Sequence, residues 1–214
     1  MTNNKITGII FDLDGVICHT DKYHYKAWKE LADEIGVYFD EEINNRLRGV
    51  SRMESLEIVL ERAEKIYTQQ EKLELAEQKN ERYKIFLNEM SHEDLSDEVR
   101  DTLNKLRERG LKLLIGSSSK NARFILERIG LGDYFDAISD GNNISNSKPH
   151  PEVFLKAAQF AGLIPEECIV VEDADAGLIA AKAANMYAVA IGWAKGSTDA
   201  DASIDSFSGL MKIF

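Results

Sequence analysis

Short apolar runs alternate with helical patterns through the second half of the chain, and this alternation limits the fold more than any other feature. The apolar runs cover residues 111–116, 136–139, 168–172 and 187–192. The helical patterns around them lie near 97–109, 120–129, 151–162 and 175–185. Short, continuously apolar strands separated by helices of about 10 to 15 residues indicate a parallel sheet covered on both faces. We therefore predict an α/β protein with a doubly wound, mostly parallel sheet.

A further strand is predicted at residues 5–11, where an apolar run ends in the turn sequence Asp-Leu-Asp-Gly. Between Asp21 and about Met90, the apolar residues follow helical spacing instead. Two capping-box signals, Ser51-x-x-Glu54 and Thr68-x-x-Glu71, predict helix starts in this segment. We therefore expect a small helical cap inserted after the first strand. The expected domains are an α/β core of residues 1–18 and 91–214 and a helical cap domain of residues 19–90.

The charge balance excludes some partners. The 214 residues include 26 Lys and Arg against 37 Asp and Glu, a formal net charge of −11. This negative field repels nucleic acid and anionic membrane surfaces, although a local basic pocket can still bind a phosphorylated small molecule. The N-terminal residues lack the pattern of a signal peptide, and no run of about 18 apolar residues occurs. We expect a cytoplasmic monomer with no nucleic-acid or membrane partner.

Acidic residues end two of the predicted strands. Asp12 and Asp14 follow the first strand, and Glu172 and Asp173 end the strand at 168–172. Ligands of open α/β sheets bind at the carboxyl ends of the strands, so these side chains are expected at one edge. Four carboxylates crowded there would repel each other unless a cation compensates them. All-oxygen ligation suits Mg²⁺, and the sequence offers no His or Cys set for zinc. We therefore predict a Mg²⁺ site.

Hydroxyl and amino groups occur at the same predicted edge. Residues 117–120, Ser-Ser-Ser-Lys, follow the strand at 111–116, and a helix N-terminus is expected near Ser119. Lys148 lies in a Lys-Pro turn before another helix. Such groups favour a phosphate, and a metal with a phosphate indicates phosphoryl transfer. A carboxylate can itself be the nucleophile, while a second carboxyl two residues on can act as general acid and base.

Four motifs resemble those of the haloacid dehalogenase superfamily. In chain order they are Asp12-Leu13-Asp14-Gly15-Val16, Ser117, Lys148-Pro149, and Glu172-Asp173 with Ala176-Gly177. The resemblance covers essentially the whole chain, because the helical insert corresponds to that superfamily's small mobile cap. It implies that Asp12 is a nucleophile and that Mg²⁺ is the cofactor.

The finer resemblance rests on Arg48-Gly49-Val50-Ser51-Arg52, Lys79-Asn80 and Ser119-Lys120-Asn121. On these residues the chain most resembles, within that superfamily, the β-phosphoglucomutase family. The resemblance implies that Asp12 becomes phosphorylated and that Asp14 moves the proton of a sugar hydroxyl. It also implies that Ser117 and Lys148 hold the transferred phosphoryl group. The Mg²⁺ ligands implied are Asp12, the Asp14 carbonyl, Glu172 and Asp173. The substrate-binding residues implied are Thr20, His24, Trp28, Arg48, Gly49, Val50, Ser51, Arg52, Lys79, Ser118, Ser119, Lys120 and Asn121.

The activity implied by this resemblance is the interconversion of β-D-glucose 1-phosphate and glucose 6-phosphate. It would proceed through an aspartyl-phosphate and a β-glucose 1,6-bisphosphate intermediate, with a small sugar phosphate as the partner molecule. Two alternatives stay open. A sugar-phosphate phosphatase would have the same core, and a catalytically silent sensor would only bind phosphorylated ligands.

Several of these residues also have ordinary structural explanations. Ser51 suits a helix N-cap, Trp28 suits core packing, and His24 on an amphipathic helix suits a structural role. Lys79 lies in a charge-rich stretch, where an exposed Lys is the default expectation. Position 48 carries Arg where the family has Lys, and the two side chains bind phosphate differently. Fine specificity is therefore left open.

Overall fold

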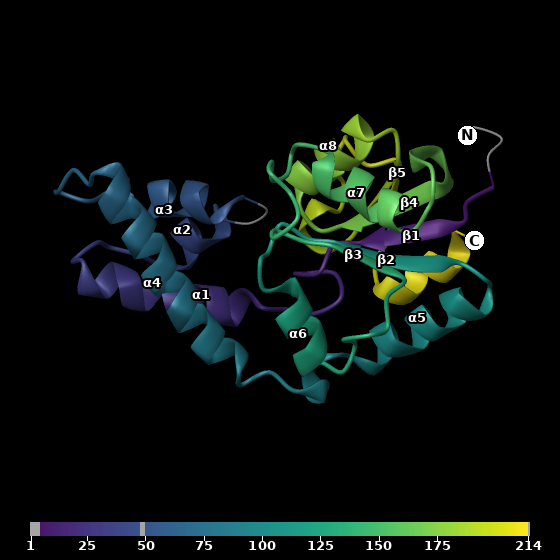
Figure 1. The fold of residues 1–214 in the computed structure, drawn as a ribbon, viewed down its shortest axis with the longest axis horizontal. Helices are drawn as coiled ribbons and strands as arrows, with labels where there is room; N and C mark the ends of the chain where they lie inside the picture. The colour runs from purple at the N-terminus through teal and green to yellow at the C-terminus, as the bar shows by residue number, and fades with distance from the viewer. Residues whose placement is uncertain (1–4, 48–49, 214) are drawn as a thin grey trace. The chain divides into compact units, whose positions relative to one another are not determined.

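The structure is a computed structural model that describes residues 5–47 and 50–213. The chain divides into two compact units, one formed by Met1–His19 with Ser91–Phe214 and the other by Thr20–Met90. The first unit, called the core unit here, contains a β-sheet with flanking helices (Figure 1). The second, called the helical unit, has only helices and connecting loops among its described residues. Each unit is described by itself below.

The core unit contains a six-stranded sheet in the order β3-β2-β1-β4-β5-β6. All of its described strand pairs are parallel, and Ile10 in the central strand is aligned with Leu114 on one side and Val170 on the other. This confirms the predicted doubly wound parallel fold. The strands are β1 (Gly8–Phe11), β2 (Lys112–Gly116), β3 (Ala137–Ser139), β4 (Cys168–Glu172), β5 (Tyr187–Ala190) and β6 (Ala202–Ser203).

Helices cover both faces of this sheet (Figure 1). On one face, Ile10, Leu114 and Val170 pack with buried residues of α7 and α8 in a single apolar cluster. On the other face, the ring of Phe11 packs 5.5 Å from the ring of Phe207 near the C-terminus. The elements are η1 (His92–Asp94), α5 (Asp97–Glu108), α6 (Ala122–Arg128), α7 (Glu152–Phe160), η2 (Pro165–Glu167), α8 (Asp175–Ala183), η3 (Gly192–Ala194) and η4 (Phe207–Lys212). Apolar strands buried on both sides explain the continuous hydrophobic runs of the sequence.

The strand order reverses between β1 and β4. From β1 the chain reaches β2 and then β3 on one side, and it then crosses to β4 on the opposite side of β1. Neighbouring connections diverge at such a switch point, and they leave a crevice at the carboxyl ends of the two strands. The topology therefore places a candidate site where β1 and β4 end.

The helical unit has its own apolar core. Its helices are α1 (Asp21–Glu34), α2 (Glu41–Asn45), α3 (Arg52–Leu60) and α4 (Gln69–Leu87). Trp28 and Leu31 of α1 pack in one cluster with Leu56 of α3 and Leu75 of α4. In the part of the chain that the structure describes, no helix is long and apolar enough to cross a bilayer.

Two helix starts of this unit follow the sequence signals closely. At the start of α3, Ser51 accepts a hydrogen bond from the Glu54 N–H, and the Glu54 carboxylate accepts one from the Ser51 N–H. Thr68 and Glu71 form the same reciprocal pair at the start of α4. Both predicted capping boxes are confirmed. They form because they satisfy backbone N–H groups that have no partner inside the helix.

Some element boundaries differ from the predictions. The helix expected near Ser119 begins at Ala122, because the hydroxyls of Ser117 and Ser119 hold residues 117–121 in turns. The strand expected at 187–192 ends at Ala190, and Gly192 has a φ of +60° that is incompatible with an extended strand. The two-residue strand β6 was not predicted, since so short a segment carries no periodic pattern.

Candidate active site

Three carboxylates meet at the carboxyl ends of the two central strands. Asp12 directly follows β1, while Glu172 ends β4 and Asp173 follows it. One carboxylate oxygen from each residue lies within 4.8 Å of the others, and all three residues are buried. The pairing of Phe11 with Val171 in the sheet brings these positions together. The site therefore depends on the register between β1 and β4.

Lys148 is a buried cation in contact with this group. Its Nζ lies 2.5 Å from Asp12 Oδ1 and also bonds to Glu172 Oε1. Burial opposes the charge on Lys148, but the carboxylates of Asp12 and Glu172 outweigh it and raise the pKa of the ammonium. Lys148 therefore stays protonated at neutral pH and compensates part of the negative charge.

Glu172 is the most deeply buried of the three acids, with 1% of its surface exposed. Burial raises the pKa of Glu172 to about 7, although Lys148 acts in the opposite direction. Its Oε2 also accepts hydrogen bonds from the backbone N–H groups of Asp173 and Ala174, at 3.0 and 3.2 Å. Its protonation is therefore sensitive to any change in nearby charge.

Two glycines allow the backbone to approach these carboxylates closely. A Cβ added at Gly15, which has a φ of +88°, would lie 2.0 Å from Asp173 Oδ2. A Cβ added at Gly177 in α8 would lie 2.0 Å from the carboxyl group of Glu172. Only glycine fits at these two positions without moving an acid. The backbone at Gly15 and Gly177 therefore lies directly against the carboxylates of Asp173 and Glu172, which limits where these carboxylates can move.

The donor set fits Mg²⁺. It consists of carboxylate oxygens, which this hard cation prefers, and the buried acids need more positive charge than one ammonium supplies. Of the four predicted acids, the described cluster contains the carboxylates of Asp12, Glu172 and Asp173, and the place of Asp14 beside them stays a prediction. The backbone of Asp14 forms a bridge with Cys18 in the turn after β1.

Residues 117–121 form a hydroxyl-rich loop after β2, called the serine loop here. The Ser117 N–H donates to the Ser139 carbonyl at 3.0 Å. Ser117 and Ser119 accept hydrogen bonds through their hydroxyls from the N–H groups of Ser119 and Asn121. Ser118 Oγ is buried and has no hydrogen-bond partner in the described structure, while Lys120 is exposed. Since β2 is paired with β1, the serine loop begins beside the end of β1, where Asp12 follows.

The turn after β3 forms hydrogen bonds to the serine loop. The Gly141 N–H donates to the Ser119 carbonyl at 3.1 Å, and Asn142 Nδ2 donates to the Lys120 carbonyl at 2.8 Å. A Cβ at Gly141 would lie 2.4 Å from the Ser118 carbonyl oxygen. These residues were not among those predicted for the site. Their turn sequence Asp-Gly-Asn after a predicted strand was the available signal.

In the helical unit, Lys79 lies among aromatic rings. Its Nζ is 2.9 Å from His24 Nδ1 and lies over the rings of Trp28 and Tyr83, at 4.8 and 4.5 Å from their centroids. Lys79 is only 2% exposed, so the default expectation of an exposed lysine is wrong here. Trp28 is confirmed as a core residue. Thr20, just before α1, is also buried.

Arg52 is the first residue of α3 and contacts two residues of α4. Its Nη2 donates to Asn80 Oδ1 at 2.9 Å, and its Nη1 lies 3.3 Å from Glu77 Oε2. Ser51 caps the same helix, as its structural explanation predicted, and Val50 precedes it in a bend. The predicted residues Arg48 and Gly49 lie outside the described residues. The contact between Arg52 and Glu77 was not predicted from the sequence.

The chain matches a haloacid dehalogenase-like hydrolase family over residues 6–185. It is 41% identical over 204 residues to a β-phosphoglucomutase of Bacillus subtilis (strain 168), and this match covers 94% of the chain and 90% of that relative. It is 33% identical over 189 residues to a fructose-1-phosphate phosphatase of Escherichia coli (strain K12), which covers 86% of this chain and 96% of that relative.

A solved structure shows the same similarity. The crystal structure of a β-phosphoglucomutase from Clostridium difficile matches with a TM-score of 0.88 and 39% sequence identity, covering 96% of this chain and 93% of that one. The relatives thus include a phosphomutase and a phosphatase. The family match spans most of the chain and includes all four sequence motifs. The chain therefore belongs to the haloacid dehalogenase-like hydrolase family, as an enzyme related to both phosphomutases and phosphatases.

Proposed function

We propose that this protein is a Mg²⁺-dependent mutase that interconverts β-D-glucose 1-phosphate and glucose 6-phosphate. The observation that carries the proposal is the buried group of Asp12, Glu172 and Asp173 in contact with Lys148. Such a group suits a nucleophilic carboxylate that must receive a dianionic phosphoryl group. The similarity to the Bacillus subtilis β-phosphoglucomutase supports the choice of substrate.

We assign the chemistry to Asp12 and Asp14. Asp12, phosphorylated on a carboxylate oxygen, transfers its phosphoryl group to the free C6 hydroxyl of β-D-glucose 1-phosphate, while Asp14 accepts the hydroxyl proton. The product is β-glucose 1,6-bisphosphate. The bisphosphate then transfers its C1 phosphoryl group to Asp12, and Asp14 returns the proton to the C1 oxygen. Glucose 6-phosphate leaves, and Asp12 is phosphorylated again.

The residues around Asp12 stabilise charge during this transfer. Lys148 holds Asp12 in place through its hydrogen bond and places a positive charge beside the phosphoryl oxygens. Ser117 contributes its hydroxyl as a donor, while its N–H is bonded to the Ser139 carbonyl. Asp12, Glu172, Asp173 and the Asp14 carbonyl would hold Mg²⁺, which supplies further positive charge against the phosphoryl group.

We assign recognition of the sugar phosphate to the helical unit and to the serine loop. In the helical unit, the candidates are Thr20, His24, Arg52 and Lys79, of which Lys79 and Arg52 are cations held in place by packing or hydrogen bonds. In the serine loop, residues 118–121 are the candidates. Arg48, Gly49, Val50 and Ser51 remain proposals from the sequence, and Trp28 is assigned to packing.

A sugar-phosphate phosphatase is the second candidate. The same Asp12 would be phosphorylated, but water would then accept the phosphoryl group. The 33% identity to the Escherichia coli fructose-1-phosphate phosphatase favours keeping it. The two functions differ in the acceptor, a sugar hydroxyl against water, and therefore in their products.

The test is to supply β-D-glucose 1-phosphate, Mg²⁺ and a trace of bisphosphate, and to measure both products together. We expect glucose 6-phosphate, measured with a coupled dehydrogenase, to form much faster than free phosphate. Free phosphate formed at a matching rate would refute the mutase in favour of the phosphatase. Asp12→Asn is the matched control, with activity expected to fall by about 1,000-fold or more. Turnover that is no greater in the wild type than in this variant would refute both enzymes.

A further inference from the structure

The guanidinium group of Arg52 is shared between a neutral and a charged acceptor. Asn80 and Glu77 lie three residues apart on α4, so their side chains project from the same side of the helix. Asn80 Oδ1 accepts from Arg52 Nη2, and Glu77 Oε2 lies 3.3 Å from Nη1. Asn80 Nδ2 also donates to Glu77 Oε1 at 3.4 Å. The three side chains therefore form one small network.

The two acceptors differ in burial and charge. Asn80 is 5% exposed, whereas the Glu77 side chain is 60% exposed. Burial lowers the pKa of Arg52, and the nearby carboxylates of Glu77 and Glu81 act in the opposite direction. The guanidinium remains charged at every physiological pH. Asn80 therefore orients Arg52 without adding charge, while Glu77 adds an exposed negative charge that a ligand can displace.

We propose that Glu77 and Asn80 together set how strongly Arg52 binds the phosphate of the substrate that is not being transferred. The proposal rests on the proposed function, in which Arg52 binds a sugar phosphate. Glu77 is a specificity-determining residue, because an incoming anion must compete with its carboxylate. A ligand without a second anionic group cannot replace the Glu77 carboxylate on Arg52, so it gains no binding free energy there. The network therefore selects sugars that carry a phosphate away from the reacting centre. Asn80 is a positioning residue that fixes the direction of the guanidinium.

Two isosteric substitutions are expected to act in opposite directions. Glu77→Gln removes the competing charge and keeps the shape of the side chain. An exposed ion pair contributes about 0.2–1 kcal/mol, so the KM for a sugar bisphosphate is expected to fall by about 2- to 5-fold. Asn80→Asp places a second carboxylate on the guanidinium, and the KM is expected to rise by about 5-fold or more. In both variants kcat is expected to stay close to that of the wild type.

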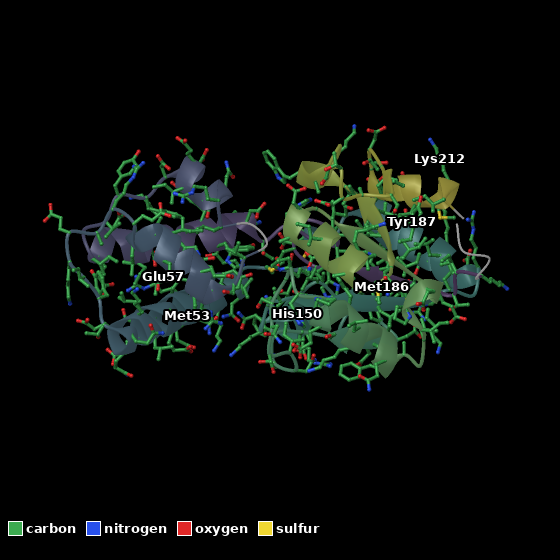
Figure 2. The ribbon with its side chains drawn as sticks, turned by 90° about the horizontal axis from the view of Figure 1, so that it is seen from above. Met53, Glu57, His150, Met186, Tyr187 and Lys212 are labelled. Atoms are coloured by element: carbon green, nitrogen blue, oxygen red, sulfur yellow. The ribbon has the colours of Figure 1, made fainter. Side chains whose placement is uncertain are left out.

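The assay measures kcat and KM for β-D-glucose 1,6-bisphosphate at a fixed concentration of β-D-glucose 1-phosphate, whose hydroxyl accepts the phosphoryl group from Asp12. Separately, it measures kcat and KM for p-nitrophenyl phosphate, with water as the acceptor. The second substrate has no distal phosphate, so its KM is expected to be unchanged in both variants. Glu57→Gln is the matched control, because Glu57 lies on α3 (Figure 2) and its carboxylate pairs with Lys72. It removes a carboxylate from the same unit without touching the Arg52 network.

A double-mutant cycle with Arg52→Met tests whether both effects pass through the guanidinium. We expect Glu77→Gln and Asn80→Asp to have no effect on KM in that background. The proposal is overturned if the two variants shift the KM in the same direction or not at all. It is also overturned if the shifts persist without Arg52, or if they appear equally with p-nitrophenyl phosphate.

The same measurements keep this proposal separate from the proposed function. The identity of the product, glucose 6-phosphate alone or free phosphate as well, tests mutase against phosphatase. The ratio of KM between variant and wild type tests Glu77 and Asn80, whichever product is formed. A phosphatase with the expected opposite shifts would refute the mutase and support the network.

Discussion

Replacing Lys148 with Met is the most direct test of how the buried site is held together. Met keeps an unbranched apolar side chain but lacks the ammonium, which lies 2.5 Å from Asp12 Oδ1 and bonds to Glu172. These three residues are each at most 7% exposed. The variant therefore leaves two carboxylates close together in a buried site without their cation. Breaking a buried ion pair by removing one partner costs about 3–5 kcal/mol.

The loss is expected to depend on pH. Burial already raises the pKa of Glu172 to about 7 with Lys148 in place, and without the ammonium this pKa rises further. Above about pH 7, the folded variant retains a proton on Glu172 that both the folded wild type and the unfolded chain have lost. Because the folded variant then binds more protons than the unfolded chain, its stability falls as the pH rises. The difference from the wild type should therefore grow above neutral pH.

Urea unfolding followed by circular dichroism measures this difference. The free energy of unfolding is determined in EDTA for wild type and variant, at about pH 6 and about pH 8.5. The double variant Lys148→Met/Glu172→Gln is the control, because it removes one of the two uncompensated carboxylates and should recover part of the loss. If Lys148→Met is as stable as the wild type at the higher pH, or if its loss does not grow with pH, the buried ion pair does not stabilise the site as described.

The remaining predictions concern the support of the site. Gly177→Ala places a Cβ against Glu172 and is expected to weaken Mg²⁺ binding by about 10- to 100-fold, measured by titration calorimetry; unchanged affinity would contradict the close packing. The pKa of Glu152 is lowered to about 2 by Lys156 and by backbone N–H groups, so its contribution to stability is present above its ordinary pKa and lost as the pH falls toward 2. Urea unfolding of wild type and Glu152→Gln should therefore converge over that range, and a difference that widens there would be inconsistent with this sign. Ser51→Ala is expected to lower the unfolding free energy by about 1 kcal/mol through loss of the N-cap, and an accompanying rise in KM would show that Ser51 also binds substrate.

Local features of the fold were predictable from the sequence. The capping boxes at Ser51 and Thr68 formed as expected, because each involves residues only three positions apart. The apolar runs formed parallel strands, since a strand buried on both faces needs apolar side chains at every position. The acids at 12, 172 and 173 were assigned to one edge of the sheet by a general rule about parallel strands.

Other features depended on contacts between distant parts of the chain. The sequence predicts Lys148 at the same edge as the acids, but only the tertiary structure shows that it contacts Asp12, 136 residues away, and Glu172. Only the tertiary structure shows that carboxylate oxygens of Asp12, Glu172 and Asp173 lie within 4.8 Å of one another. Hydrophobic spacing reports which positions are buried but not which residues meet there.

The helical unit shows the same limit. The charge-rich sequence around Lys79 favours exposure, yet packing against Trp28 and Tyr83 buries this lysine. Arg52 meets Glu77 and Asn80 because α3 and α4 pack together, which depends on the tertiary structure. The sequence by itself determined most of the secondary structure, the sheet class and the chemical groups available, since these follow from local spacing and residue type. The tertiary structure decided which charges are paired and how deeply they are buried, because these depend on long-range packing.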